Sequence, residues 1–396
     1  MSQTDFHYQK KGLPASLSRL GLIIFVVGTV LSLLAFFVDQ ERAIFNYLVT
    51  YMMIVSIGLG SLFLIGLEYI AGADWSTPIR RIPEFFAMLL PVLFVLVIPI
   101  LFFNHDLFHW AHKEAVADDK ILQGKAPYLN VTFFIVRTFV FIGLWSLFYF
   151  VMTRNSRKQD ETKDQSLTKK NIRLGAIFIP VFALSITFTA VDLMMSLEPH
   201  WFSTIYGVYY FSGTVVASLA AITIAVILLK EKGYFGSWMT NDHLFSLGAL
   251  LFAFVNFWAY IAFSQFMLIW YADLPEETFW YLTRWNGGWV FISLLLIVVH
   301  FLVPYFALLT QPSKMNPKVL KFIAVWLLFA HLLDMFWLIM PNMGSMKSGY
   351  VFSWIDLVFP IAGTGLVILV FVFAAKKANL IPIGDPKLKR GIDFHL

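Results

Sequence analysis

The sequence predicts an all-α polytopic membrane protein with ten transmembrane helices. Its composition is the first observation, because 59% of the 396 residues are hydrophobic and only 13% are charged. Soluble domains carry about 25% charged residues. The second observation is a series of ten apolar segments, each close to the twenty residues that an α-helix needs to cross a bilayer.

The ten segments follow one another with short polar connections. The first begins after a polar N-terminus, lacks the small-residue cleavage pattern of a signal peptide and is therefore expected to stay in the protein. The predicted spans lie near residues 17–38, 44–71, 85–104, 129–152, 173–195, 202–229, 243–271, 285–309, 318–340 and 352–375.

Lysine and arginine are distributed unequally between the two sides of these spans. With the N-terminus in the cytoplasm, 22 of the 29 fall in inside segments, 6 in outside segments, among them Arg42, and one, Arg137, within a span. The positive-inside rule then predicts that both termini are cytoplasmic. The 153–173 connection, with its mixed charges, is expected to be a solvated cytoplasmic loop. The outside segment 104–128 is expected to begin as a helical extension of the third span and to form a docking surface.

An internal repeat indicates how the spans are grouped. Asp192 precedes Pro199 by seven residues, and Asp334 precedes Pro341 by seven, in spans five and nine. The match suggests two four-helix bundles, spans 2–5 and 6–9, flanked by spans 1 and 10, although two positions can also match by chance. The expected parts are residues 1–43, 44–200, 201–341 and 342–396.

Charged residues inside spans are costly and are usually paired or functional. Arg137 and Asp192 lie at comparable depth in neighbouring spans, so we expect an ion pair that either only holds the bundle together or lines a polar path or ligand pocket. Glu68 and Glu84, beside Arg80 and Arg81, are expected either to form the inner half of such a path or to belong to an interfacial ion-pair network.

The second half carries its own candidates. His331 and Asp334 are three residues apart and share a helix face, and His300 lies deep in span eight. A histidine and an aspartate on one face suit a proton relay, and a hydrogen bond within the core explains them nearly as well.

Further candidates lie at the predicted outer surface. The spacing of His105, His109 and His112 would place them on one stripe of a helix, and Glu198 and His200 follow span five. The pattern lacks the ligands of a recognised metal site, so we expect none. The chain contains no cysteine, which excludes covalently attached haem c and cysteine-ligated iron–sulfur clusters on this subunit. Its basic charge is explained by loops that face anionic lipid, so no nucleic-acid binding is expected.

Several motifs together resemble a known family. They are "GADWSTPIRR" and "EFFAMLLP" after span two, "HDLFHWAH" at the end of span three, "YLN" and "FFIVR" at the start of span four, "SRKQD" after it, and "VDLMMSLEPHWFSTIYGVYYFSG" through spans five and six. These are similar to the F-type membrane component of alternative complex III, the bacterial quinol:electron-acceptor oxidoreductase, within the NrfD/polysulfide-reductase superfamily of membrane subunits. The resemblance implies ten spans in two four-helix bundles in a bacterial inner membrane.

The resemblance also implies a function and partners. A quinol such as menaquinol is oxidised, and electrons leave through iron–sulfur clusters and c-type haems on partner subunits. The expected partners are an NrfD-like paralogue, an iron–sulfur subunit, multihaem and monohaem cytochrome c subunits, a terminal oxidase and lipids. Asp192, Arg137 and the His105/His109 segment fall where the family has its outer polar cluster.

Three functions therefore compete. The leading one is a membrane subunit of a respiratory quinol oxidoreductase that supplies a proton path or a quinol-binding region without a redox centre of its own. A proton-coupled secondary transporter is the second, but matched Gly/Pro interruptions in the two halves are missing from the sequence. The third is a scaffold that anchors peripheral redox subunits.

Overall fold

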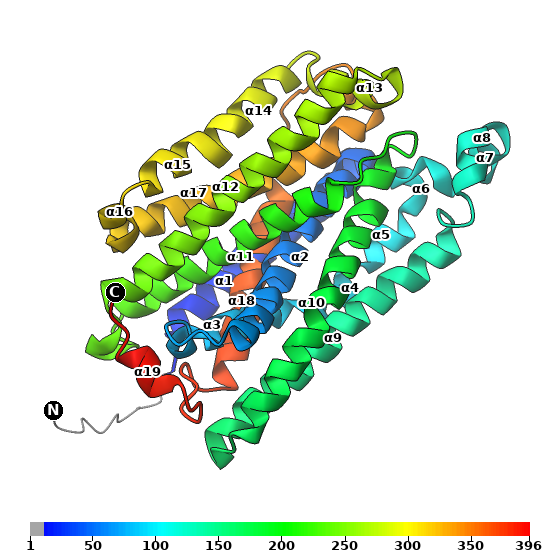
Figure 1. Ribbon diagram of the computed structural model, residues 1–396. Coiled ribbons are helices and arrows are strands. Elements are labelled where there is room, and N and C mark those ends of the chain that lie inside the picture. Colours follow the sequence, from blue (N-terminus) through cyan, green and yellow to red (C-terminus); the bar gives the residue numbers. More distant parts are fainter. Residues whose placement is uncertain (1–11) are drawn as a thin grey trace, which may run out of the picture.

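The computed structural model describes residues 12–396, which are mostly helical and contain no β-strand in that range (Figure 1). Ten helical segments are long and apolar enough to cross a membrane, which confirms the predicted fold class. Eight spans are built from the helices α1 (Ala15–Val38), α2 (Gln40–Ala71), α9 (Val131–Thr162), α10 (Ser166–Leu193), α11 (Tyr206–Glu231), α12 (Asn241–Ala272), α17 (Pro317–Ile339) and α18 (Ile355–Lys376).

The remaining two spans are interrupted helices. The third consists of α3 (Arg81–Ala87), α4 (Leu89–Leu96) and α5 (Ile98–Phe102). The eighth consists of α14 (Trp289–Leu296), a π-helical segment η5 (Ile297–Leu302) and α15 (Val303–Leu308). A π-helical turn inside a span is uncommon and often marks a functional site. His300 lies within this segment.

Shorter helices lie at the two ends of the bundle. They are η1 (Thr77–Ile79), α6 (Asn104–Leu107), η2 (His109–Ala111), α7 (Lys113–Asp118), α8 (Lys120–Lys125), η3 (Met195–Leu197), η4 (Gly236–Trp238), α13 (Pro275–Arg284), α16 (Gln311–Met315), η6 (Met340–Asn342), η7 (Gly344–Met346) and α19 (Leu388–Ile392). We call the end formed by residues 72–80, 231–241 and 378–396 the terminal face. The opposite end, formed by residues 103–130, 194–205, 272–288 and 340–354, is the distal face.

Helices α2 and α11 form the centre of the molecule. Their most apolar stretches are 94% and 83% buried, against 22% for α1, and the two helices pack against each other. Around α2 lie α3, α4, α9 and α10. Helices α12 and α17 pack on α11, and α15 packs on both of them. These contacts suit two groups of four spans, and the division into separate bundles stays a prediction.

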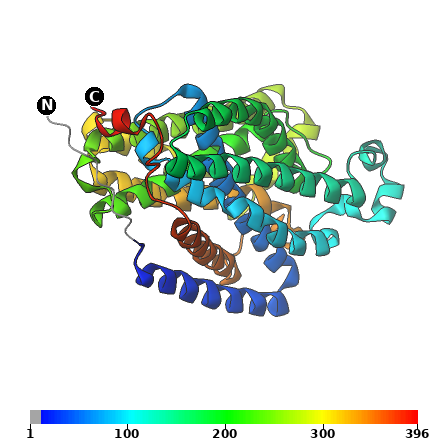
Figure 2. The same ribbon diagram turned by 90° about the horizontal axis from the view of Figure 1, so that it is seen from below.

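Helices α1 and α18 lie side by side along one edge of the molecule (Figure 2). Asp356 of α18 accepts hydrogen bonds from Arg42 Nε at 2.8 Å and Arg42 Nη2 at 2.6 Å. Arg42 is therefore a buried residue in the first turn of α2 and not part of the connection between spans one and two, while its predicted side of the membrane stays a prediction. Hydropathy puts the start of the span too late, because the first turn of α2 is polar.

The predicted solvated loop after span four is also wrong. Helix α9 continues to Thr162 and α10 begins at Ser166, so only three residues connect them. Polar residues of this extension face inward: Ser156 donates to Glu84 at 2.7 Å, and Asp160 pairs with Arg81 at 2.7 Å. A polar helix face that packs on other polar groups cannot be distinguished from a loop by hydropathy.

Candidate functional site

The centre of the candidate site is Asp334 on α17, which is fully buried. Tyr209 of α11 donates a hydrogen bond to its Oδ1 at 2.5 Å, and Trp258 of α12 donates to its Oδ2 at 3.0 Å. Both donors are neutral, and within residues 12–396 no lysine or arginine forms an ion pair with this carboxyl group. A buried carboxyl group without a cation is costly in a membrane interior and is therefore a functional candidate.

Two buried histidines accompany Asp334. The His300 ring stacks on Trp258, with ring centroids 3.8 Å apart, and neither of its nitrogens has a hydrogen-bond partner. His331 Nε2 lies 3.0 Å from Ser56 Oγ of α2, which leaves its Nδ1 without a partner. His331 and Asp334 both face Gly213 of α11, where an added Cβ would lie 2.9 Å from His331 Nδ1. His331 and Asp334 therefore lie on one face of α17, as predicted, and Gly213 leaves room for their side chains because it has none of its own.

The same three residues are close enough to be considered as metal ligands. One atom from each of His300, His331 and Asp334 can be chosen so that the three lie within 4.8 Å of one another. Two imidazoles and a carboxylate are a ligand set that zinc and ferrous iron accept. Both Asp334 oxygens already accept hydrogen bonds, from Tyr209 and Trp258, and His331 is bonded to Ser56, so we interpret the three residues as a buried polar cluster rather than as a metal site.

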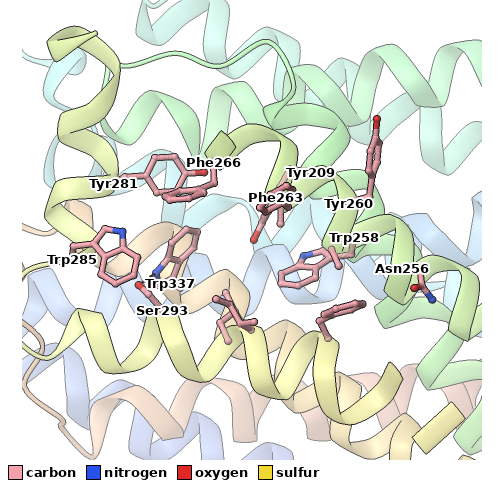
Figure 3. Close-up of a pocket in the computed structure, with 15 residues that line it drawn as sticks. Tyr209, Asn256, Trp258, Tyr260, Phe263, Phe266, Tyr281, Trp285, Ser293 and Trp337 are labelled. Atoms are coloured by element: carbon pink, nitrogen blue, oxygen red, sulfur yellow. Dashed lines mark hydrogen bonds between the residues drawn. The ribbon is translucent and has the colours of Figure 1, made fainter. Parts of the chain in front are cut away.

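A cavity of about 560 Å³ adjoins this cluster. Most of its wall residues are aromatic, and α12 supplies more of them than any other helix. Tyr209 and Trp258, the two donors to Asp334, are part of its wall. In Figure 3, Tyr281, Phe266, Trp285 and Trp337 gather at one end of the cavity, with Tyr209, Trp258 and Tyr260 toward the other. Tyr260 and Phe263 are 65% and 58% exposed, so the cavity reaches the lipid-facing surface.

Arg284 lies beside the distal end of this cavity and is 1% exposed. Its guanidinium donates to the carbonyl oxygens of Trp280, Trp337 and Leu338 at 2.9 to 3.2 Å and lies 3.3 Å from the Trp280 ring centroid. Burial lowers the pKa of Arg284. The carbonyl oxygens and the Trp280 ring solvate the guanidinium inside the protein.

Hydroxyl groups continue from His331 toward the terminal face along the α2–α11 contact. Tyr210 Oη lies 3.1 Å and Thr214 Oγ1 3.3 Å from Ser56 Oγ. An added Cβ on Gly60 would lie 2.5 Å from Ser218 Oγ, so the two helices touch there. Further along, Glu68 lines a cavity of about 140 Å³, and its Oε2 has no hydrogen-bond partner.

Arg137 and Asp192 form an ion pair, as their depth suggested. Arg137 Nε and Nη2 each lie 2.9 Å from an Asp192 oxygen, and Nη1 donates to the Tyr128 carbonyl oxygen at 2.8 Å. The rings of Tyr128 and Phe133 cover the guanidinium, with centroids 3.8 and 4.2 Å away. This arrangement engages three of the five guanidinium N–H groups and fits a structural pair.

Glu84 belongs to an ion-pair network and does not line the cavity of about 140 Å³ beside Glu68. It pairs with Arg81 at 2.6 Å and accepts a hydrogen bond from Ser156. Arg80 pairs with Asp385 of the C-terminal segment instead of with Glu68. Of the predicted inner group, Glu68 alone lines the cavity described above.

The outer histidines gather at the distal face, but the segment is not one helix. α6 ends at Leu107, Phe108 and His112 are extended, and η2 lies between them, so the predicted single stripe is wrong. The chain nevertheless folds back so that the His105 and His112 rings are 4.9 Å apart. A cavity of about 370 Å³ is lined by these residues and others, among them His105, His109, His112, Glu198, His200 and Glu41.

His200 connects this distal cavity to the α7–α8 segment. Its Nε2 lies 2.5 Å from Asp119 Oδ2 and its Nδ1 3.5 Å from Glu198 Oε1. The hydrogen bond with His200 lowers the pKa of Asp119. Asp192 does not line this cavity, although Glu198 and His200 do.

The chain matches no family model and no curated protein. The resemblance to the alternative complex III subunits therefore stays an expectation from its motifs.

The sequence did not single out Tyr209, Trp258 or Ser56, although each contacts the central group. Aromatic residues make up 18% of the chain, so two of them in spans carry no distinguishing signal. Serine in a span usually bonds to its own helix, as Ser56 does to the Met52 carbonyl oxygen. Only the helix packing reveals their role.

Proposed function

We propose that this chain is an integral membrane subunit of a respiratory quinol:electron-acceptor oxidoreductase. It supplies a quinol-binding region and a proton path in a bacterial inner membrane, with both termini in the cytoplasm. Electrons leave through iron–sulfur clusters and c-type haems on partner subunits. The motif resemblance, the membrane fold and the absence of cysteine support this assignment.

One observation carries the proposal: both hydrogen-bond donors of buried Asp334 line the aromatic cavity. A cavity of about 560 Å³ is within the usual range of ligand pockets, and its aromatic walls suit a flat ring with an apolar tail. Quinol oxidation releases two protons and two electrons. The cavity side offers the Tyr209 hydroxyl, hydrogen-bonded to Asp334, as a group through which a proton can be received.

The path proposed for protons continues from Asp334 to His331 and Ser56, and along the α2–α11 hydroxyl groups toward Glu68. Twelve residues separate Ser56 from Glu68 on α2, about 18 Å of helix. Direct hydrogen bonds join His331 to Ser56 and Ser56 to Tyr210 and Thr214, and the proposal requires water between Asp334 and His331 and beyond Thr214. The cavity beside Glu68, about 140 Å³, has room for about four waters at roughly 30 Å³ each.

Assembly tests the first half of the proposal. The affinity-tagged chain, purified from its own membrane in mild detergent, is expected to carry c-type haem and iron–sulfur subunits with it, seen by absorbance and iron analysis. Isolation without haem, together with proton-driven movement of a solute in vesicles, would establish the transporter alternative instead.

Turnover tests the second half. In the assembled complex, Asp334→Asn is expected to slow the reduction of co-purified haem by reduced menadione at least 100-fold, because general acid–base groups contribute about 10² to 10⁴. Tyr209→Phe is expected to slow it about tenfold. Tyr206→Phe is the matched control, since Tyr206 is buried on the same helix but is outside the cavity wall. Wild-type rates in Asp334→Asn complexes would refute the quinol site and leave a scaffold.

A further inference from the structure

Tyr281 of α13 lies at the distal end of the aromatic cavity and is fixed by packing. Its ring meets the rings of Phe266 and Trp280 edge to face, with centroids 5.3 and 4.9 Å away. Trp280 in turn stacks on Trp201, with centroids 4.5 Å apart. A side chain whose rotamer is locked by its neighbours presents its polar atom in one direction, as a binding group must.

A buried amide contacts the Tyr281 hydroxyl from outside the cavity wall. Gln265 of α12 is 1% exposed, and its Nε2 donates to Tyr281 Oη at 3.1 Å. Its Oε1 accepts a hydrogen bond from Ser203 Oγ, also at 3.1 Å. Burial raises the pKa of Tyr281 to about 12, so the hydroxyl keeps its proton at neutral pH. Within residues 12–396 no acceptor takes that proton, so it can be donated to a ligand.

Four other polar side chains of the cavity wall already donate within the protein. Tyr209 and Trp258 both donate to Asp334. Trp337 Nε1 donates to Ser293 Oγ at 2.7 Å, and Ser293 Oγ donates to a backbone carbonyl oxygen at 2.9 Å. Toward a ligand, the Tyr209 hydroxyl can therefore act only as an acceptor.

The two tyrosines consequently offer opposite hydrogen-bonding groups to the same cavity. In Figure 3, the Tyr281 hydroxyl points from one end of the cavity toward the side of Tyr209, whereas the Tyr260 hydroxyl points away from the other labelled residues. An aromatic slot with an acceptor at one place and a donor at another fits a flat ring that carries oxygens on opposite edges. A para-quinol is such a ring.

We propose that Tyr281 binds the second oxygen of the quinol, the one farther from Asp334. One quinol hydroxyl group donates to Tyr209 Oη, and the oxygen on the opposite edge of the ring accepts from Tyr281. Because Tyr281 only donates, it binds the reduced and the oxidised ring alike and orients both. This role rests on the proposed quinol site, and it determines which edge of the ring faces Asp334.

Ligand binding to the purified complex tests this role. The affinity for tritiated menadione is measured by equilibrium dialysis, and that for 2-methylnaphthalene, which has the same two rings and no oxygen, by competition. Tyr281→Phe is expected to weaken menadione binding about three- to tenfold, the effect of one neutral hydrogen bond, and to leave 2-methylnaphthalene binding unchanged. Tyr260→Phe is the matched control in the same wall, 65% exposed, and should bind both ligands like the wild type.

The two ligands separate the outcomes. Unchanged binding of 2-methylnaphthalene in Tyr281→Phe also shows that the variant is folded. Equal weakening of both ligands in this variant, or an equal loss of menadione in Tyr260→Phe, would overturn the role of the Tyr281 hydroxyl. Wild-type menadione affinity in Tyr281→Phe, with weaker binding in Trp258→Ala, would overturn this role and keep the quinol site. Absence of saturable menadione binding to the wild-type complex would overturn the proposed function together with it.

Discussion

The Arg137–Asp192 pair gives the sharpest test of whether a buried ion pair of this fold is structural. Asp192→Asn removes the charge and keeps the size, so Arg137 keeps the Tyr128 carbonyl and two aromatic rings but loses its counter-ion. Breaking a buried pair typically costs about 3 to 5 kcal/mol. Because Arg137 and Asp192 are 7% and 2% exposed and Arg137 keeps other partners, we expect the lower end, about 3 kcal/mol.

A double-mutant cycle measures this effect. The free energy of unfolding in mixed micelles is compared for wild type, Asp192→Asn, Arg137→Met and the double variant, in which no charge remains unpaired. We expect the double variant to recover about 2 kcal/mol relative to Asp192→Asn, and assembled complexes of both variants to turn over at wild-type rates. A variant that assembles normally but loses turnover would refute the structural interpretation and return Asp192 to the proton path.

The remaining predictions concern pH, metal content and topology. Since the folded pKa of Asp119 is lowered by His200, the stability that its ionised form contributes to the α7–α8 segment is present above the unfolded pKa and is lost as pH falls through the folded value. The protection of the amides of residues 113–125 from exchange, relative to an unfolded chain at the same pH, should therefore persist down to about pH 4 and fall below it. Asp119→Asn should lower this protection already at pH 7. A loss of protection near pH 6 in the wild type would point to another group. The interpretation of His300, His331 and Asp334 as a metal-free polar cluster predicts less than one metal ion per three chains after purification with EDTA, whereas stoichiometric zinc or iron that disappears in His300→Ala would contradict it. Cysteines at Ser166 and Ala117, both exposed, should react with an impermeant reagent from opposite sides of the membrane, and labelling of both from one side would refute the topology.

Sequence reasoning found those parts of the fold that depend on hydropathy. All ten spans were located because each carries a long apolar stretch, and Arg137 and Asp192 were matched because each is a lone charge at a countable depth. Arg42 and Asp356 were missed because they lie 314 residues apart at the ends of their helices, where a charge is unremarkable. The extension of α9 to Thr162 was missed because its residues are mostly polar, and a polar helix that packs on other polar groups has the same composition as a solvated loop.

The central site shows the other limit. His331 and Asp334 were identified from their three-residue spacing on one helix. What distinguishes Asp334 from Asp192 is the partner, neutral Tyr209 and Trp258 in one case and Arg137 in the other. These partners come from other helices, so the internal repeat in the sequence cannot show that the two aspartates have different surroundings. The π-helical turn that carries His300 has no recognised sequence signature.

Photolabelling with a quinone tests the central claim most directly. The complex in native membranes is exposed to a photoreactive naphthoquinone, and labelled peptides are mapped with and without excess menadione. The proposal predicts menadione-sensitive labels in residues 256–266 and 281–301, which form most of the wall of the aromatic cavity, and loss of these labels in Trp258→Ala. Trp289→Ala, which changes a buried tryptophan outside the wall, should keep them. Labels confined to other segments, or insensitive to menadione, would contradict a quinol site at Asp334.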